Sequence, residues 1–97
     1  MSTFLLTYHF PKTYPVGSPD NVAAWRAWFQ SIGANLADAG KPVIQRRTIG
    51  NTPPDTLQGG YTLITADDIE GAAKLAEGCP GLEHGIGIEV GELPIAS

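Results

Sequence analysis

The spacing of apolar residues divides the chain into predicted strands and helices, beginning with a strand at residues 3–10. That segment, "TFLLTYHF", is rich in aromatic and β-favouring residues and stops at Pro11. Successive side chains of a strand alternate between its faces, so Tyr8 and His9 are expected on opposite faces. Apolar residues occur on both faces, which indicates a central strand that is covered on both sides.

The second predicted element is an amphipathic helix that begins after a loop. Ser18 is a good N-cap residue, and Pro19 suits the first helical position. Apolar residues then recur at spacings of three and four, and this stripe is expected to lie in the core. The stripe consists of Val22, Trp25, Phe29, Ile32 and Leu36. Gly40, followed by Pro42, indicates where the helix ends.

The middle of the chain predicts two further strands with a long connection between them. Residues 43–50 ("VIQRRTIG") and residues 61–65 ("YTLIT") have the composition of strands. The connection at residues 51–60 ("NTPPDTLQGG") is too polar and too rich in proline for regular structure.

The last third predicts a helix and a final strand. Asp67 and Glu70 stand in capping-box spacing at the start of the helix, and Gly78 ends it. Residues 85–93 ("GIGIEVGEL") follow as the fourth strand. The order β-α-β-β-α-β predicts an α+β fold, a ferredoxin-like sandwich with two helices on one face of a four-stranded antiparallel sheet. The open face is where a partner or ligand is expected.

Composition and charge narrow the class of protein. The 97 residues predict a single domain spanning 1–97, and a chain this short is expected to cover its open sheet face with a second copy, as a homodimer. A net charge of −4 with scattered basic residues disfavours nucleic acids and anionic membranes as partners. One cysteine and an N-terminal segment without signal-peptide or membrane-span character predict a cytoplasmic protein.

The chain also resembles the YCII-related family, known as the DGPF family, over nearly its whole length. The matching segments are "FLLTYH", "AWRAWFQSIGANLADAGKPV", "GGYTLITADDIEGAAKLAEGCPGLEHG" and "IEVGEL". The resemblance implies a dimeric α+β barrel, in which two sheets pack face to face, and a function that is mostly unassigned. For some members it implies a catalytic pair, a histidine early in the first helix and an aspartate near its end. Asp38 is the candidate for the aspartate, but "VAAWRAW" holds no histidine, and the "DGPF" tetrapeptide is absent.

Two histidines and a carboxylate are the candidate catalytic groups. The predicted topology sets the fourth strand antiparallel to the first, which brings His9 near His84, with Glu83 or Glu89 in reach. Such a group is suited to acid/base chemistry near neutral pH. It lacks the spacing of a metal site, so no metal is expected. The simpler interpretation is that each histidine ends a strand and bonds to a loop carbonyl group.

The last strand and several side chains elsewhere are candidates for ligand binding. Three glycines surround Glu89 on one face of that strand and form a shallow trough, suited to packing, a dimer contact or a ligand. Arg46 has the planar fork that binds anionic groups, although pairing with an acid is the simpler role. Trp28 flanks the apolar stripe and suits a pocket or a dimer seam. The candidates are Tyr8, Trp28, Arg46, Tyr61, Gly85 and Gly87.

These residues leave three functions open. The first is a cofactor-free lyase or isomerase in which His9 or His84 acts as acid/base, oriented by Glu89. The second is a non-catalytic module that binds a small molecule or a protein partner, and the third is a scaffold in a larger assembly. No phosphate loop, dinucleotide fingerprint or nucleophile elbow is present, so no cofactor is expected. Cys79 follows a helix C-terminus, which disfavours a thiolate nucleophile and indicates a structural role.

Overall fold

The computed structural model describes residues 1–14 and 18–95 of the chain. Within these residues the elements follow the order β-α-β-β-α-β, with two short 3₁₀ turns. The strands are β1 (Ser2–Pro11), β2 (Leu36–Asp38), β3 (Thr56–Ala66) and β4 (Gly87–Leu93). The helices are α1 (Pro19–Ile32) and α2 (Ile69–Ala76), and the 3₁₀ turns are η1 (Gly33–Asn35) and η2 (Pro80–His84).

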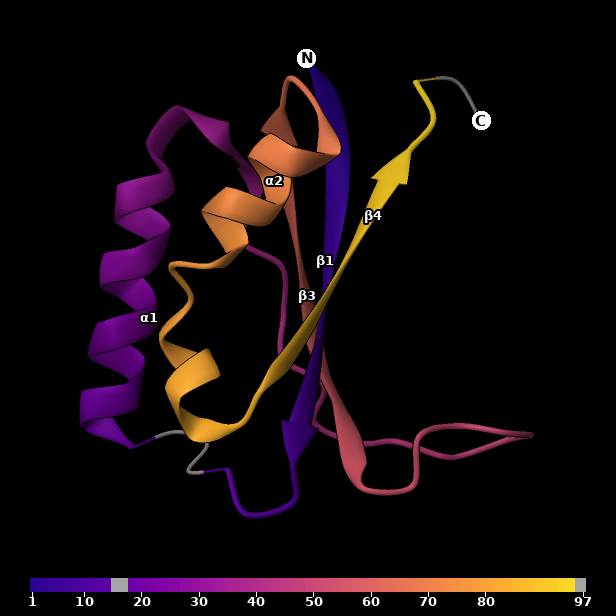
Figure 1. The fold of residues 1–97 in the computed structure, drawn as a ribbon. Helices are drawn as coiled ribbons and strands as arrows, with labels where there is room; N and C mark the ends of the chain where they lie inside the picture. Colours follow the sequence, from indigo (N-terminus) through magenta and orange to yellow (C-terminus); the bar gives the residue numbers. More distant parts are fainter. Residues whose placement is uncertain (15–17, 96–97) are drawn as a thin grey trace.

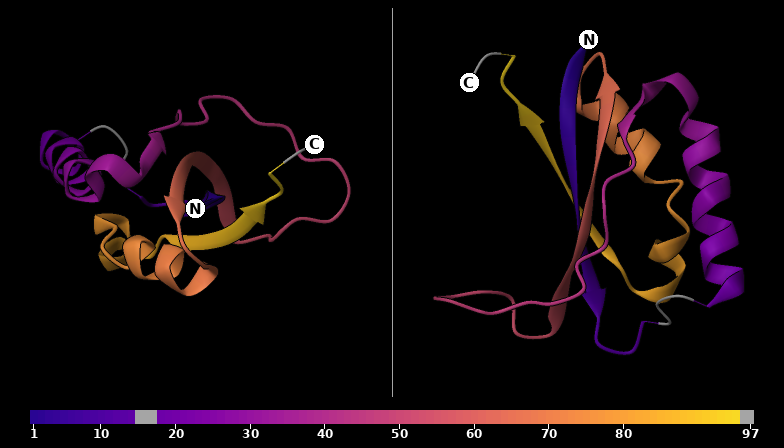
Figure 2. Two further views of the ribbon diagram at one scale, coloured as in Figure 1. Left: turned by 90° about the horizontal axis from the view of Figure 1, so that it is seen from above. Right: turned by 180° about the vertical axis from the view of Figure 1, so that it is seen from behind.

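The sheet has the strand order β2-β3-β1-β4, and every neighbouring pair is antiparallel. β1 is central, with Leu5 opposite Leu63 of β3 and Thr7 opposite Glu89 of β4. Both helices lie on the same side of this sheet, and its other face carries no helix in the described residues (Figures 1 and 2). This arrangement is the predicted ferredoxin-like α+β fold.

The core lies between the helices and the face of the sheet that they cover. Phe4 and Leu6 of β1 and Ile64 of β3 are fully buried there. Trp28 and Ile32 of α1 close the core from the helix side. The residues of β1 that point the other way are only partly buried, so the open face is half exposed in one chain.

The structure corrects the predicted second strand. Residues 43–50 form a loop that extends away from the body of the molecule (Figure 1). The strand that pairs with β3 is β2, formed by residues that the sequence placed in the first helix. The helix ends earlier because Gly33 adopts a left-handed φ of 63°, and Leu36 then pairs with Ile64.

β3 is also longer than predicted, since residues 56–60 belong to it rather than to a turn. The strand passes through a bulge opposite Tyr8 and His9, where Gly59 and Gly60 lie. A side chain at Gly59 would stand 2.5 Å from the ring of Phe10, so glycine permits this close approach. Glycine therefore does not mark a turn in this segment.

The helix starts follow capping rules, with one correction. Ser18 caps α1 as predicted, since its Oγ accepts a hydrogen bond from the backbone N–H of Asn21. α2 is capped by Asp68, whose carboxylate accepts from the backbone N–H of Gly71, and not by the predicted Asp67. Across the described residues, neither helix has the length and apolar character needed to cross a membrane.

Candidate functional site

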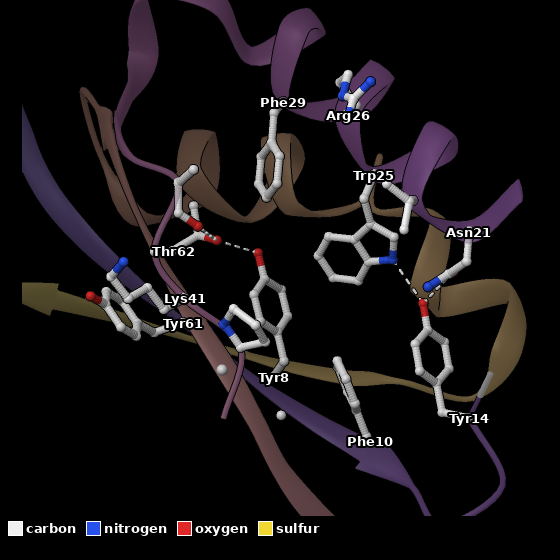
Figure 3. A pocket seen from close by; sticks show the side chains of 16 residues that line it. Tyr8, Phe10, Tyr14, Asn21, Trp25, Arg26, Phe29, Lys41, Tyr61 and Thr62 are labelled. Atoms are coloured by element: carbon white, nitrogen blue, oxygen red, sulfur yellow. Dashed lines mark hydrogen bonds between the residues drawn. The ribbon is translucent and has the colours of Figure 1, made fainter. Parts of the chain in front are cut away.

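A cavity of about 430 Å³ lies between α1 and the sheet. Its walls come from β1 and the loop after it, residues 21–29 of α1, residues 59–62 of β3 at and after the bulge, and segment 39–42, which follows β2. Six aromatic residues contribute to its lining (Figure 3), and Tyr61 does so at the edge, since it pairs with Thr7, whose side chain lies on the other face of the sheet. The six residues are Tyr8, Phe10, Tyr14, Trp25, Phe29 and Tyr61.

The segment 39–42 closes one side of the cavity, and its path depends on Gly40. This residue has a φ of 77°, and a side chain here would collide with the backbone carbonyl group of Tyr61. Asp38 holds the start of this turn, because its Oδ1 accepts a hydrogen bond from the N–H of Gly40 at 2.9 Å. The carboxylate that matched the family's aspartate by position thus has a local hydrogen-bonding role.

The aromatic walls are held in place by ring contacts. Tyr8 packs edge-on against Trp25, with ring centroids 5.0 Å apart. The ring centroids of Phe10 and Tyr14 lie 4.6 Å apart. These two pairs, together with the contact between Trp25 and Phe29, pack five of the six rings against one another, which favours a preformed cavity.

The polar groups of the walls are hydrogen-bonded to one another. The Tyr8 hydroxyl lies 2.7 Å from Thr62 Oγ1, and Thr62 donates in turn to the backbone O of Ala39 at 2.9 Å. Trp25 Nε1 donates to the Tyr14 hydroxyl, which donates to Asn21 Oδ1. Burial raises the pKa of Tyr8 above its ordinary value, so this phenol stays neutral.

The charged residues of the cavity walls are basic. Arg26 of α1 and Lys41 of the connecting segment line it, and both side chains are exposed. Among the described residues, no histidine, aspartate or glutamate belongs to the lining. The cavity thus offers apolar ring surface, a few neutral hydrogen-bonding groups and two cations.

The structure brings two of the three predicted catalytic residues together, outside this cavity. His9 Nε2 lies 3.3 Å from Glu89 Oε1 on the open face of the sheet. The strand register explains this contact, since Glu89 pairs with Thr7 and Gly87 pairs with His9 on the adjacent strand. The side chains of His9 and Glu89 are 30% and 78% exposed, so water reaches the pair.

His84 lies elsewhere. It is the last residue of η2, and its ring centroid is 6.0 Å from that of Tyr14, on the helix side of the sheet. The hydrogen bonds and ring contacts found over residues 1–14 and 18–95 include none between His84 and His9. His9 instead contacts Glu89, whereas His84 belongs to η2 and its ring lies against Tyr14.

Tyr8 and Tyr61 are the predicted ligand-binding residues that line the cavity. Trp28 does not line it: this side chain is 5% exposed, and its Nε1 donates to the backbone O of Leu75 at 3.1 Å. Arg46 is also outside the cavity. Its guanidinium donates to the backbone O of Gln58 and of Val43, so it holds the loop against β3.

The two candidate glycines are also outside the cavity. Gly85 ends η2 with a φ of 87°, and Gly87 lies on the open face beside His9. Sequence reasoning placed Trp25 and Phe29 in the core, whereas the structure places both at the cavity wall, partly buried.

Cys79 is buried, as its predicted structural role requires. Its side chain is 3% exposed, and burial raises the pKa of the thiol to about 11. The raised pKa keeps the thiol protonated at neutral pH, which disfavours a role as nucleophile. Across the described parts of the chain, no three histidine, cysteine or acidic residues gather as metal ligands would.

Neither a protein-family model nor a curated protein sequence matches this chain. Among solved structures, the fold is similar to that of 5-chloro-2-hydroxyhydroquinone dehydrochlorinase (TftG) from Burkholderia phenoliruptrix AC1100, in complex with 2,5-dihydroxybenzoquinone. The TM-score is 0.68, with 20% sequence identity over 95% of this chain and 93% of that chain. This likeness shows a shared fold, while membership of the YCII-related family stays a prediction.

Proposed function

We propose that this protein binds a small, planar aromatic compound in the cavity between α1 and the sheet. One observation carries the proposal: a cavity of about 430 Å³ whose lining includes six aromatic residues, five of them on the helix side of the sheet and Tyr61 at the edge. Ligand pockets have volumes of roughly 300–1,000 Å³ and are mostly apolar, with a few placed polar groups. A single substituted ring fits a cavity of this size and lining.

The polar groups of the cavity favour a ring that carries oxygen substituents. The hydroxyl group of Tyr8 and the amide of Asn21 are neutral hydrogen-bonding groups in a wall made largely of aromatic rings. Arg26 and Lys41 favour a ligand with an anionic or electron-rich oxygen. The dehydrochlorinase of similar fold was solved with a dihydroxybenzoquinone, which is a compound of this class.

The experiment is a calorimetric titration with hydroquinone, repeated with two variants. Phe29→Ala removes a ring from the cavity wall, and we expect hydroquinone affinity to fall about tenfold. Ile69→Ala is the matched control, because Ile69 is an exposed apolar residue of α2 that does not line the cavity. Equal affinity for both variants, or no binding by the wild-type protein, would contradict the proposal.

A second candidate function rests on the pair of His9 and Glu89. Their 3.3 Å contact has the geometry of an acid/base pair, as a cofactor-free lyase or isomerase requires. The pair lies on the open face, so a catalytic pocket there would need a second copy of the chain to cover it. On this alternative, hydroquinone binds beside His9 and the Phe29→Ala variant binds it normally.

The partner that we propose for the open face is a second copy of the chain. Leu5, Leu63 and Leu93 lie on this face and are only partly buried in one chain. The loop beyond β2 carries two more exposed apolar residues, Ile44 and Ile49, which are 93% and 88% exposed. Apolar surface of this extent favours burial against a partner, and the commonest arrangement is a twofold-symmetric dimer.

A further inference from the structure

The polar wall of the cavity is a chain of hydrogen bonds with a fixed direction. It runs from the Tyr8 hydroxyl through Thr62 Oγ1 to the backbone O of Ala39, over distances of 2.7 and 2.9 Å. All three residues line the cavity, and Tyr8 and Thr62 are 4% and 0% exposed (Figure 3). Water therefore does not compete strongly for these hydroxyl groups.

The direction follows from counting protons. A backbone carbonyl oxygen only accepts hydrogen bonds, so Thr62 uses its single hydroxyl proton to donate to Ala39. Thr62 then has only lone pairs to offer to Tyr8. The Tyr8 hydroxyl must donate its own proton to Thr62, which leaves the Tyr8 oxygen with a lone pair and no proton for a ligand.

We infer that the cavity selects aromatic ligands that carry a hydroxyl group, and that the Tyr8 oxygen accepts the hydrogen bond from that hydroxyl. This inference rests on the proposed function and names the class of ligand: phenols, as opposed to their ethers. If an ether or carbonyl oxygen of the ligand lies beside the Tyr8 oxygen, two hydrogen-bond acceptors face each other and neither has a proton to donate. Such a mismatch of buried polar groups rejects the ligand.

Two features make Tyr8, and not Tyr14, the selective residue. The Tyr14 hydroxyl already accepts from Trp25 Nε1 at 2.7 Å and donates to Asn21 Oδ1 at 2.6 Å, so it is committed in both directions. The Tyr8 oxygen receives no hydrogen bond from any residue that the structure describes. Burial also raises the pKa of Tyr8, which keeps its proton in place at neutral pH.

The test compares para-cresol with its methyl ether as probes, using calorimetry or NMR titration. We expect the wild-type protein to bind para-cresol about tenfold more tightly than the ether. Thr62→Val removes the group that takes the Tyr8 proton, so Tyr8 becomes a donor. The variant should bind the ether better than the wild type does, and the preference for para-cresol should fall to about onefold or invert.

Thr7→Val is the matched control for this substitution. Thr7 precedes Tyr8 on β1 but points to the open face, so the tenfold preference should persist. Tyr8→Phe is a second test that leaves Thr62 intact. It removes the acceptor, so para-cresol loses its hydrogen bond, the ether loses the mismatch, and the tenfold preference for para-cresol should disappear.

The outcomes separate this inference from the proposed function. If both probes bind the wild-type cavity equally and neither Thr62→Val nor Tyr8→Phe changes the ratio, the inference is wrong and aromatic binding stands. If neither probe binds the wild-type protein, the proposed function fails and the inference fails with it. A preference that Thr62→Val abolishes and Thr7→Val retains supports both.

Discussion

Gly40 shows how a single position without a side chain shapes the cavity. The segment 39–42 crosses the edge of β3 so closely that a side chain at Gly40 would meet the carbonyl group of Tyr61. Gly50 has a similar left-handed φ of 73°, yet a side chain there would meet nothing within 4 Å. Substituting Gly50 therefore measures the cost of the backbone angle alone, whereas substituting Gly40 measures that cost together with the cost of the collision.

Gly40→Ala is expected to lower the free energy of unfolding by about 3 kcal/mol, because it adds a steric collision to an unfavourable φ. Gly50→Ala introduces only the unfavourable φ, so it should lower the free energy of unfolding by about 1 kcal/mol. Urea unfolding of both variants measures the difference. Equal losses would show that segment 39–42 moves aside freely and does not form a fixed wall.

Residue patterns predicted the cavity only in part. Tyr8 and Tyr61 were expected near a ligand and line the cavity. The sequence pattern did not identify Thr62 or Tyr14 as cavity residues. Their roles depend on hydrogen bonds to Ala39 and Asn21, which lie 23 and 7 positions away in the chain. His84 was expected beside His9, but it ends the 3₁₀ turn η2, which the sequence pattern did not predict, and its ring lies against Tyr14.

At the scale of elements, the sheet shows why local pattern is not enough to find every strand. Leu36 fits the helical stripe, but it also fits a strand once Gly33 has ended α1. Residues 43–50 have strand-like composition and still form a loop. The edge of β3 is already occupied by β2 and by the bridge between Pro42 and Gly60, so the loop finds no partner strand in the described chain.

The remaining elements were predictable because local and long-range preferences agree. β1 is rich in β-favouring residues and its burial alternates, and the order of elements fits a sheet with β1 at its centre. α1 begins at the residue that its cap and Pro19 indicate. Fold class therefore followed from the sequence, whereas the cavity required the positions of β2 and segment 39–42.

At the scale of the whole molecule, the open face of the sheet predicts a dimer. Leu63 lies on this face opposite Leu5, so Leu63→Glu would place a charge in the proposed interface twice. Sedimentation should find the wild-type protein dimeric at micromolar concentration and the variant monomeric. Ile69→Glu on α2 is the control and should stay dimeric. A monomeric wild type, or a dimeric Leu63→Glu variant, would contradict the proposed dimer.

The central claim is that an aromatic ligand binds between α1 and the sheet, and NMR mapping of bound hydroquinone tests it most directly. We expect the largest chemical-shift changes on the cavity residues, among them Trp25 Nε1–H and the backbone N–H groups of Gly40 and Thr62. Changes centred on His9 and Glu89, with the cavity unaffected, would place the site on the open face and contradict the claim.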